Sequence, residues 1–311
     1  MNSFLFFSIP FFTGIVALYG LLEISRRTHF LVDKPEGDAL KIHTKSIPLL
    51  GGLAMLISSL MGAILFFDSP FVIQVVGIFI GLLFVFFLGF YDDYKWKHVS
   101  TIKPLLKFVF LIACTLLPSL VLWWAGVAFV VILGVTIPIV IGFLYIFLCI
   151  NAVNYQDGMD GLAGGQVCIS LAGFLLLALA TGNALAIGIS LIFLGTTVAF
   201  LMFNLPPAKV FMGDSGAYSL GFALAVLAML FSRPHDMYSF IAPIFIIGLP
   251  IFDGVFTNIR RLVAVKSIFL GDRSHFYDKL LQKGFSTRKT LAICYGLQIL
   301  FVIIGVMIYR A

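Results

Sequence analysis

The segment 151–165 carries the side chains best suited to chemistry in this chain. It reads Asn151-Ala-Val-Asn154-Tyr-Gln-Asp157-Gly-Met-Asp160-Gly-Leu-Ala-Gly-Gly, with two amides, two carboxylates and no basic residue. Glycine permits tight turns and the close approach of a ligand to the backbone. Helix capping explains one or two such Asp or Asn residues, but not two uncompensated acids together with two amides. The segment therefore predicts a functional loop.

Two further acidic motifs stand at the ends of apolar segments. Asp92 and Asp93 are adjacent, and neighbouring residues of a helix point about 100° apart. We therefore expect one acid to face a metal ion or substrate and the other to pair with a lysine. Asp214-Ser215-Gly216 begins another apolar segment, so Asp214 and Ser215 are candidate N-caps. A helix N-terminus also attracts anions such as a nucleotide phosphate.

Cations gather in two other loops. Lys41, His43 and Lys45 precede one apolar segment, and the stretch 258–289 holds eight Lys and Arg residues. Phosphates are natural ligands for such groups, although most of these residues are expected simply to attract anionic lipid head groups. Mg²⁺ is usually held by one or two carboxylates plus substrate phosphates. The residue types together predict a magnesium–diphosphate site that serves phosphoryl transfer or hydrolysis at a membrane surface.

The composition predicts the elements that must position these side chains. Hydrophobic residues make up 61% of the 311 residues and charged residues 11%, whereas soluble domains carry about 25% charged residues. A membrane-spanning helix needs about 20 apolar residues. The segments that qualify are 4–22, 47–67, 71–90, 105–124, 135–150, 163–180, 184–203, 216–231, 239–257 and 290–309. We predict an all-α polytopic membrane protein, in which residues 1–311 form one transmembrane domain.

The distribution of charge orients these segments. Cytoplasmic loops carry the excess of Lys and Arg, and 18 of the 20 basic residues fall on one side of the predicted topology. That side is therefore expected to be cytoplasmic, with both termini outward. Of the 14 acidic residues, only Asp68 and Asp236 fall on the outer side. The acids at the cytoplasmic helix ends favour chemistry on a water-soluble cytoplasmic substrate.

The same pattern argues against other classes of protein. An ion-coupled transporter would place ionisable residues near the membrane midplane, where these segments hold few polar residues beyond Gln74, Ser170 and Gln298. No soluble basic domain exists to bind nucleic acid. The four cysteines lie in apolar segments without metal-type spacing, so neither disulfides nor zinc are expected.

The motifs together resemble a known family. The chain is similar to the polyprenyl-phosphate N-acetylhexosamine-1-phosphate transferases, also called glycosyltransferase family 4. The motifs that carry the resemblance are His43…Pro48-x-x-Gly51-Gly52, Asp92-Asp93, Asn151-x-x-Asn154-x-x-Asp157-Gly-x-Asp160-Gly, Phe211-Met-Gly-Asp214-Ser-Gly, and Pro250-Ile-Phe-Asp253 with Arg260-Arg261. They occur in family order over nearly the whole chain, and the third and fourth are highly specific.

The resemblance implies a reaction and residue roles. A polyprenyl phosphate, such as undecaprenyl phosphate, attacks a UDP-N-acetylhexosamine and releases UMP, with Mg²⁺ required and Mn²⁺ as an alternative. Asp214 and Asn154 correspond to the metal site. The residues implied in catalysis are Asp92, Asp93, Asp157 and Asp160. The residues implied in substrate binding are Lys41, His43, Lys45, Asn151, Asn154, Phe211, Asp253, Arg273 and His275.

The sugar is the least determined part of this reading. Many GlcNAc-type relatives carry a histidine cluster after an Asp-Arg pair, whereas this chain has only His275 after Asp272-Arg273. The Asp-Arg-x-His form still resembles the GlcNAc-1-phosphate branch more than the phospho-MurNAc-pentapeptide branch, which remains the alternative. The family also implies an inner (plasma) membrane location, contact with membrane lipid and a homodimer.

Overall fold

Helices form nearly all the regular structure of the computed structural model, which describes residues 3–33, 46–95, 104–128, 136–233, 235–264 and 273–310. The elements in chain order are α1 (Ser3–Thr28), β1 (Val32–Asp33), β2 (Ile47–Pro48), α2 (Gly51–Ala63), the 3₁₀ turn η1 (Ile64–Phe66), α3 (Val72–Lys95), α4 (Pro104–Trp124), α5 (Thr136–Gln156), α6 (Leu162–Thr181), α7 (Ala184–Asn204), α8 (Gly213–Leu230), α9 (Met237–Ile247), α10 (Leu249–Val263), α11 (Phe276–Gln282) and α12 (Thr287–Arg310).

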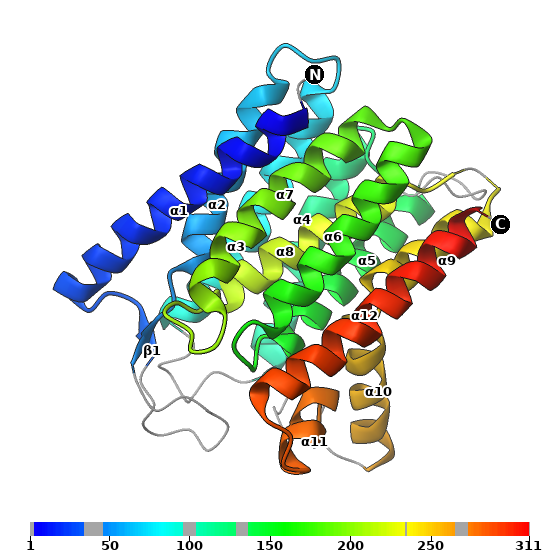
Figure 1. Cartoon of the computed structure of the whole chain (residues 1–311). Coiled ribbons are helices and arrows are strands. Elements are labelled where there is room, and N and C mark those ends of the chain that lie inside the picture. Colours follow the sequence, from blue (N-terminus) through cyan, green and yellow to red (C-terminus); the bar gives the residue numbers. More distant parts are fainter. Residues whose placement is uncertain are drawn as a thin grey trace.

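The helices confirm the prediction of an all-α polytopic membrane protein. Within the described residues, seven helices are long and apolar enough to cross a bilayer, or eight if the bent pair α9–α10 counts as one span. Shorter apolar helices cover Gly51–Phe66 and Val109–Trp124. Helices suit lipid because all their backbone hydrogen bonds lie within the segment. The count of ten spans and the outward termini stay predictions, and both ends of the chain lie at the same end of the bundle (Figure 1).

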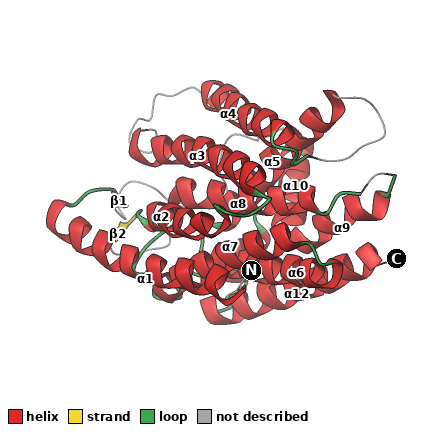
Figure 2. Ribbon diagram, turned by 90° about the horizontal axis from the view of Figure 1, so that it is seen from above, coloured by secondary structure: helices red, strands yellow, loops and turns green. Residues whose placement is uncertain are grey.

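Helix α8 is the centre of the bundle. Seen from above, it lies among α2, α3, α5, α6 and α7 (Figure 2), and almost all of its residues are buried. Small residues such as Gly221, which lies against the backbone of Cys149 and Ile150 in α5, allow this close packing. Whatever α8 presents at its first turn is therefore enclosed by the ends of its neighbours.

The predicted ninth span is not one continuous helix. Helices α9 and α10 meet at Gly248 with a bend of 85°. Gly248 has a φ of +60°, a conformation that residues with a Cβ rarely adopt. Gln298 of α12 satisfies the backbone groups freed by the break: its Oε1 accepts from the Leu249 N–H and its Nε2 donates to the Ile246 carbonyl, both over 2.9 Å. The isolated polar residue of the twelfth helix thus has a structural role.

Two helices extend beyond their predicted ends, which moves functional residues from loops onto helices. Helix α3 continues to Lys95 and α5 to Gln156, whereas the apolar pattern ends at 90 and 150. The polar turns continue the helices because they are held by contacts with neighbouring elements rather than by lipid. Asp92, Asp93, Asn151 and Asn154 therefore occupy fixed helical positions.

A short antiparallel pair of strands lies between α1 and α2, and its end is hydrogen-bonded to the segment that precedes α8. Strand β1 pairs with β2, and beyond β2 the Phe211 N–H donates to the Pro48 carbonyl over 2.9 Å. The N–H groups of Gly51 and Gly52 donate in turn to the carbonyls of Phe211 (2.9 Å) and Met212 (3.0 Å). The Pro-x-x-Gly-Gly motif thus holds the segment that leads into α8.

The break at Gly248 predicts a position-specific effect on stability. A Cβ at this residue would lie 2.6 Å from the Phe301 Cβ and 2.8 Å from the Phe245 carbonyl oxygen, in addition to the strain of the positive φ. We expect Gly248→Ala to lower the free energy of unfolding by about 1–3 kcal/mol, measured as a lower thermal midpoint in detergent. Gly296→Ala on α12, where a Cβ meets nothing within 4 Å, is the control and should not lower the midpoint, because Ala favours a helix interior over Gly.

Candidate active site

A carboxylate from one helix caps the buried start of another. The Asp93 carboxylate, in the last turn of α3, accepts hydrogen bonds from the backbone N–H groups of Asp214 (2.9 Å) and Ser215 (3.1 Å) and from the Ser215 hydroxyl (2.9 Å). The first N–H groups of a helix have no partner within it, and the helix dipole favours negative charge there. Asp93 therefore satisfies and electrostatically stabilises the first turn of α8.

This cap corrects the prediction that Asp214 or Ser215 caps its own helix. The N-cap residue is Met212, which makes no side-chain capping hydrogen bond. Gly213 has a φ of +68°, and a Cβ there would lie 2.5 Å from Asp93 Oδ2. The glycine of the motif is thus required both by the backbone conformation and by the approach of the carboxylate. The cap comes from a distant helix, so the local sequence could not reveal it.

Asn154 and Asp214 are brought together as predicted. The Asn154 Nδ2 atom donates to Asp214 Oδ1 over 2.9 Å, which joins the end of α5 to the start of α8. Asp92 is buried beside Asp93, and the two are 2% and 1% exposed. Tyr218, one turn after Asp214, interacts electrostatically with Asp92, Asp93 and Asp214. We call Asp92, Asp93, Asn154 and Asp214 the acidic centre.

The turn between α5 and α6 is fastened to the loop that precedes α8. Asp160 Oδ2 accepts from the Ala208 N–H, and Asn204 Oδ1 accepts from the Gly161 N–H, both over 2.9 Å. The Tyr295 hydroxyl donates to the Gly161 carbonyl over 2.6 Å. Asp160 thus connects the turn to this loop, and Asp157, three residues earlier, interacts electrostatically with Tyr277 of α11.

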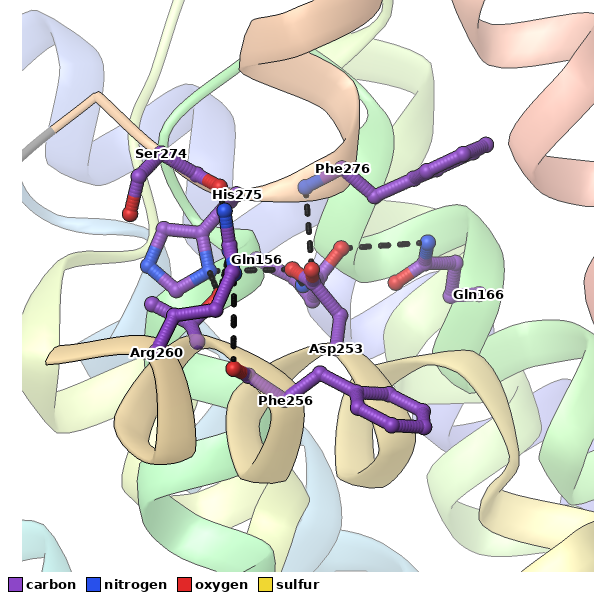
Figure 3. A network of polar contacts seen from close by, with 9 residues as sticks. Gln156, Gln166, Asp253, Phe256, Arg260, Ser274, His275 and Phe276 are labelled. Atoms are coloured by element: carbon purple, nitrogen blue, oxygen red, sulfur yellow. Dashed lines mark hydrogen bonds and ion pairs between the residues drawn. The ribbon is translucent and has the colours of Figure 1, made fainter. Parts of the chain in front are cut away.

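A second polar centre is built around Asp253 of α10 (Figure 3). Asp253 Oδ2 accepts from Gln156 Nε2 over 2.8 Å and contacts His275 Nδ1 at 2.9 Å, while Oδ1 accepts from the Phe276 N–H over 2.9 Å. Gln156 Oε1 accepts in turn from Gln166 Nε2 at 3.3 Å. We call Gln156, Asp253 and His275 the histidine centre. Both oxygens of Asp253 are directed at protein groups.

The loop that carries His275 is anchored from both sides. Arg260 Nη2 donates to the Ser274 carbonyl over 2.6 Å (Figure 3), and Arg273 Nε lies 3.5 Å from Asp278 Oδ1. Burial raises the pKa of the Asp278 carboxyl, which the charge of Arg273 partly opposes. Burial and the nearby acids Asp278, Asp253 and Asp157 raise the pKa of the Tyr277 phenol. The loop is thus held by Arg273 and by the buried side chains of Tyr277 and Asp278, which interact electrostatically.

Helix α5 connects the two centres. Asn154 belongs to the acidic centre and Gln156 to the histidine centre, and Tyr155 between them lies against the His275 ring, with ring centroids 5.2 Å apart. The Tyr277 ring stacks near the same imidazole at 6.0 Å. The last turn of α5 therefore sets the position of His275 relative to Asp214.

The other predicted site residues have different outcomes. Asn151 Nδ2 donates back to the Phe147 carbonyl over 2.7 Å, and the Phe211 backbone is paired with the Pro-x-x-Gly-Gly segment. Arg273 borders the histidine centre. Lys41, His43 and Lys45 lie outside the described residues.

Sequence reasoning missed the roles of Tyr155, Gln156, Gln166 and Tyr218. Tyr155 and Gln156, which lie between Asn154 and Asp157 in a predicted site, were the two with a detectable signal.

The acidic centre has the oxygen ligands with which a protein could hold a magnesium ion that a bound phosphate completes. Within the described parts of the chain, no group of three or more His, Cys, Asp or Glu side chains is arranged to hold a metal ion. Mg²⁺ does not need such a cage, because substrate phosphates and water supply most of its ligands. Asp214, next to Asn154, can provide the protein carboxylate.

Comparisons with known proteins agree with this architecture. Residues 75–232 match the family described as glycosyl transferase family 4. A probable undecaprenyl-phosphate N-acetylglucosaminyl 1-phosphate transferase from Bacillus subtilis (strain 168) is 32% identical over 90% of this chain and 78% of its own. A phospho-N-acetylmuramoyl-pentapeptide-transferase from Dictyoglomus turgidum is 31% identical over 97% and 99%. An undecaprenyl-phosphate alpha-N-acetylglucosaminyl 1-phosphate transferase from Thermotoga maritima is 29% identical over 95% and 86%.

The fold and the acidic centre define an integral membrane protein with a polar site at its helix ends, and the relatives of this chain are sugar-phosphate transferases by name. The chain belongs to glycosyl transferase family 4. The resemblance inferred from its loop motifs is thereby confirmed.

The cap made by Asp93 predicts a graded loss of stability. Asp93→Ala leaves two backbone N–H groups and the Ser215 hydroxyl without their acceptor, and each buried unsatisfied group costs about 1–3 kcal/mol. We expect a clearly lower thermal midpoint for the purified protein without substrate. Ser215→Ala removes one of the three hydrogen bonds and should lower the midpoint less. An Asp93→Ala variant as stable as the parent would show that Asp93 does not hold α8.

Proposed function

We propose that this protein transfers N-acetylglucosamine 1-phosphate from UDP-N-acetylglucosamine to undecaprenyl phosphate at the cytoplasmic face of the plasma membrane. The observation that carries the proposal is the meeting of Asp93, Asn154 and Asp214 at the buried start of α8, in a family whose relatives bear the corresponding names. The product would be a polyprenyl-diphosphate-sugar, and the reaction would serve as a first membrane step in cell-envelope polysaccharide synthesis.

The proposed reaction is a displacement at the phosphorus that bears the sugar. An oxygen of the lipid phosphate forms the new bond to this phosphorus, the bond to the bridging oxygen breaks, and UMP leaves with that electron pair. A phosphate monoester is largely ionised near neutral pH, since its second pKa is about 6. Positioning and charge neutralisation should therefore supply most of the rate.

The acidic centre divides into different tasks in this proposal. Asp214 and Asn154 hold Mg²⁺, or Mn²⁺ as an alternative, which would neutralise the charge of the diphosphate when bound. Asp93 is committed to the first turn of α8, so any proton acceptor of the pair would be Asp92. Asp157 lies where the nucleotide is expected, and Asp160 shapes the same turn. Among the cations between α1 and α2 in the sequence, Lys41 and Lys45 are proposed to bind the lipid phosphate.

The histidine centre is proposed to bind the sugar part of the donor through His275 and Arg273. A carboxylate only accepts hydrogen bonds, so the contact with Asp253 places a hydrogen on Nδ1 of His275. In the neutral ring, Nε2 is then an acceptor for a sugar hydroxyl or amide. Asp253 thus acts through His275, as a positioning residue, rather than by touching the donor.

Release of UMP tests the proposed function directly. With undecaprenyl phosphate and Mg²⁺, we expect UMP from UDP-N-acetylglucosamine and none from UDP-MurNAc-pentapeptide, with activity lost on chelation and restored by Mg²⁺. The reverse preference would support the second candidate, the phospho-MurNAc-pentapeptide transferase, which the relative from Dictyoglomus turgidum favours by its nearly complete coverage. Turnover of neither donor would contradict both.

The role of Asp253 predicts a change in donor use. In Asp253→Asn, an amide faces the two donors Gln156 Nε2 and His275 Nδ1, so the imidazole loses its fixed tautomer. Because a hydrogen bond to a charged group contributes about 1.5–3 kcal/mol, we expect kcat/KM for the UDP-sugar to fall roughly tenfold or more, with a displaced pH profile. KM for the lipid phosphate should not change. Asp236→Asn, which alters the N-cap at the far end of α9, is the control and should match the parent.

A further inference from the structure

Gln166 is a buried amide in the second turn of α6, and only one of its two polar atoms is hydrogen-bonded. The side chain is 0% exposed. Its Nε2 atom donates to Gln156 Oε1 at 3.3 Å (Figure 3), whereas its Oε1 atom has no hydrogen-bond partner among the described residues. A buried acceptor without a partner lowers stability, so its presence in a native structure needs a reason. The orientation of this amide serves Gln156 and not its own acceptor.

The direction of these hydrogen bonds follows from the carboxylate of Asp253. A carboxylate only accepts hydrogen bonds, so Asp253 Oδ2 requires the Nε2 atom of Gln156, which donates to it over 2.8 Å. Gln156 is 1% exposed, so its Oε1 atom needs a donor from the protein. Among the described residues, Gln166 Nε2 is that donor. In the opposite orientation, the Gln166 amide would place its oxygen against the oxygen of Gln156.

Both ends of this series of contacts are held in place. At one end, Asp253 Oδ2 also contacts His275 Nδ1 at 2.9 Å, so α5 and the N-cap of α11 meet at a single oxygen. At the other end, the Ser170 hydroxyl accepts from Gln298 Nε2 over 2.9 Å, which fastens α6 to α12 one turn beyond Gln166. The amide of Gln166 therefore acts from a fixed position.

We propose that Gln166 is a positioning residue for His275, an inference that rests on the proposed function. It acts through Gln156, whose amide it keeps directed at Asp253. Asp253 then holds the imidazole by Nδ1 and leaves Nε2 to accept from the sugar. Without the Gln166 donor, Gln156 Oε1 is buried and unsatisfied, so the Gln156 amide no longer has one preferred orientation. The sugar part of the donor is then bound less tightly, and the nucleotide part is bound as before.

Donor binding without lipid tests this proposal. Affinities for UDP-N-acetylglucosamine and for UMP are measured with Mg²⁺ in detergent. In Gln166→Met, we expect the affinity for the UDP-sugar to fall roughly threefold to tenfold, as for loss of a neutral hydrogen bond. The affinity for UMP, which has no sugar, should not change. The thermal midpoint should change little, because the substitution removes one buried unsatisfied acceptor, Gln166 Oε1, and creates another, Gln156 Oε1.

A matched control and a double-mutant cycle identify the route. Gln74→Met makes the same change on α3, outside this series of contacts, and should bind both ligands as the parent does. Gln156→Met removes a hydrogen bond to a charged group and should lower the affinity for the UDP-sugar roughly tenfold or more. In that background, Gln166→Met should have no further effect, because residues that act through one another are not additive.

The possible failures are distinguishable. Additive losses in the double variant, a parallel loss of UMP affinity, or a Gln166→Met protein that binds the UDP-sugar like the parent would each overturn the positioning role. A parent that binds the UDP-sugar but releases no UMP with undecaprenyl phosphate would contradict the proposed function instead, and the affinities would still decide the role of Gln166. A parent that binds neither UDP-N-acetylglucosamine nor UDP-MurNAc-pentapeptide would contradict both.

Discussion

The buried start of α8 is the constraint on which the site depends. Enclosure by neighbouring helices leaves the first N–H groups of α8 with neither helical partners nor ready access to water, and the Asp93 carboxylate supplies the missing acceptor. The same contact places α3 against α8 and fixes Asp214 beside Asn154. Gly213 leaves room for the Asp93 carboxylate at this contact. The N–H groups of Gly51 and Gly52 hold the segment that directly precedes α8.

The last turn of α5 couples the two polar centres. The last turn of α5 carries one residue of each, so Asn154 and Gln156 cannot move independently. Tyr155 extends the same turn to the imidazole of His275. A ligand that spans a diphosphate and a sugar would meet both centres at once, and the rigid turn would set the distance between them.

The break between α9 and α10 explains how the segment from α10 to α11 reaches the histidine centre. The bend at Gly248 turns α10 away from α9 and toward the end of the bundle that holds α11 (Figure 1). Asp253 on α10 then meets His275 at the start of α11. Gln298, which stands alone in an apolar sequence, makes the break tolerable in an apolar setting because it satisfies the freed backbone groups.

The sequence by itself determined the all-helical membrane class, the positions of the apolar helices and the family, because hydrophobic runs and loop motifs are local signals. It also predicted Asn154, Asp214 and His275 as site residues, and their functional roles stay predictions. Only the tertiary structure decided which side chains meet. Asp93 caps α8 in place of Asp214 or Ser215. Asp253 contacts His275, and Gln156 donates to the same carboxylate. These are contacts between side chains far apart in the chain, whose pairing depends on how helices pack and not on any local pattern of residue types.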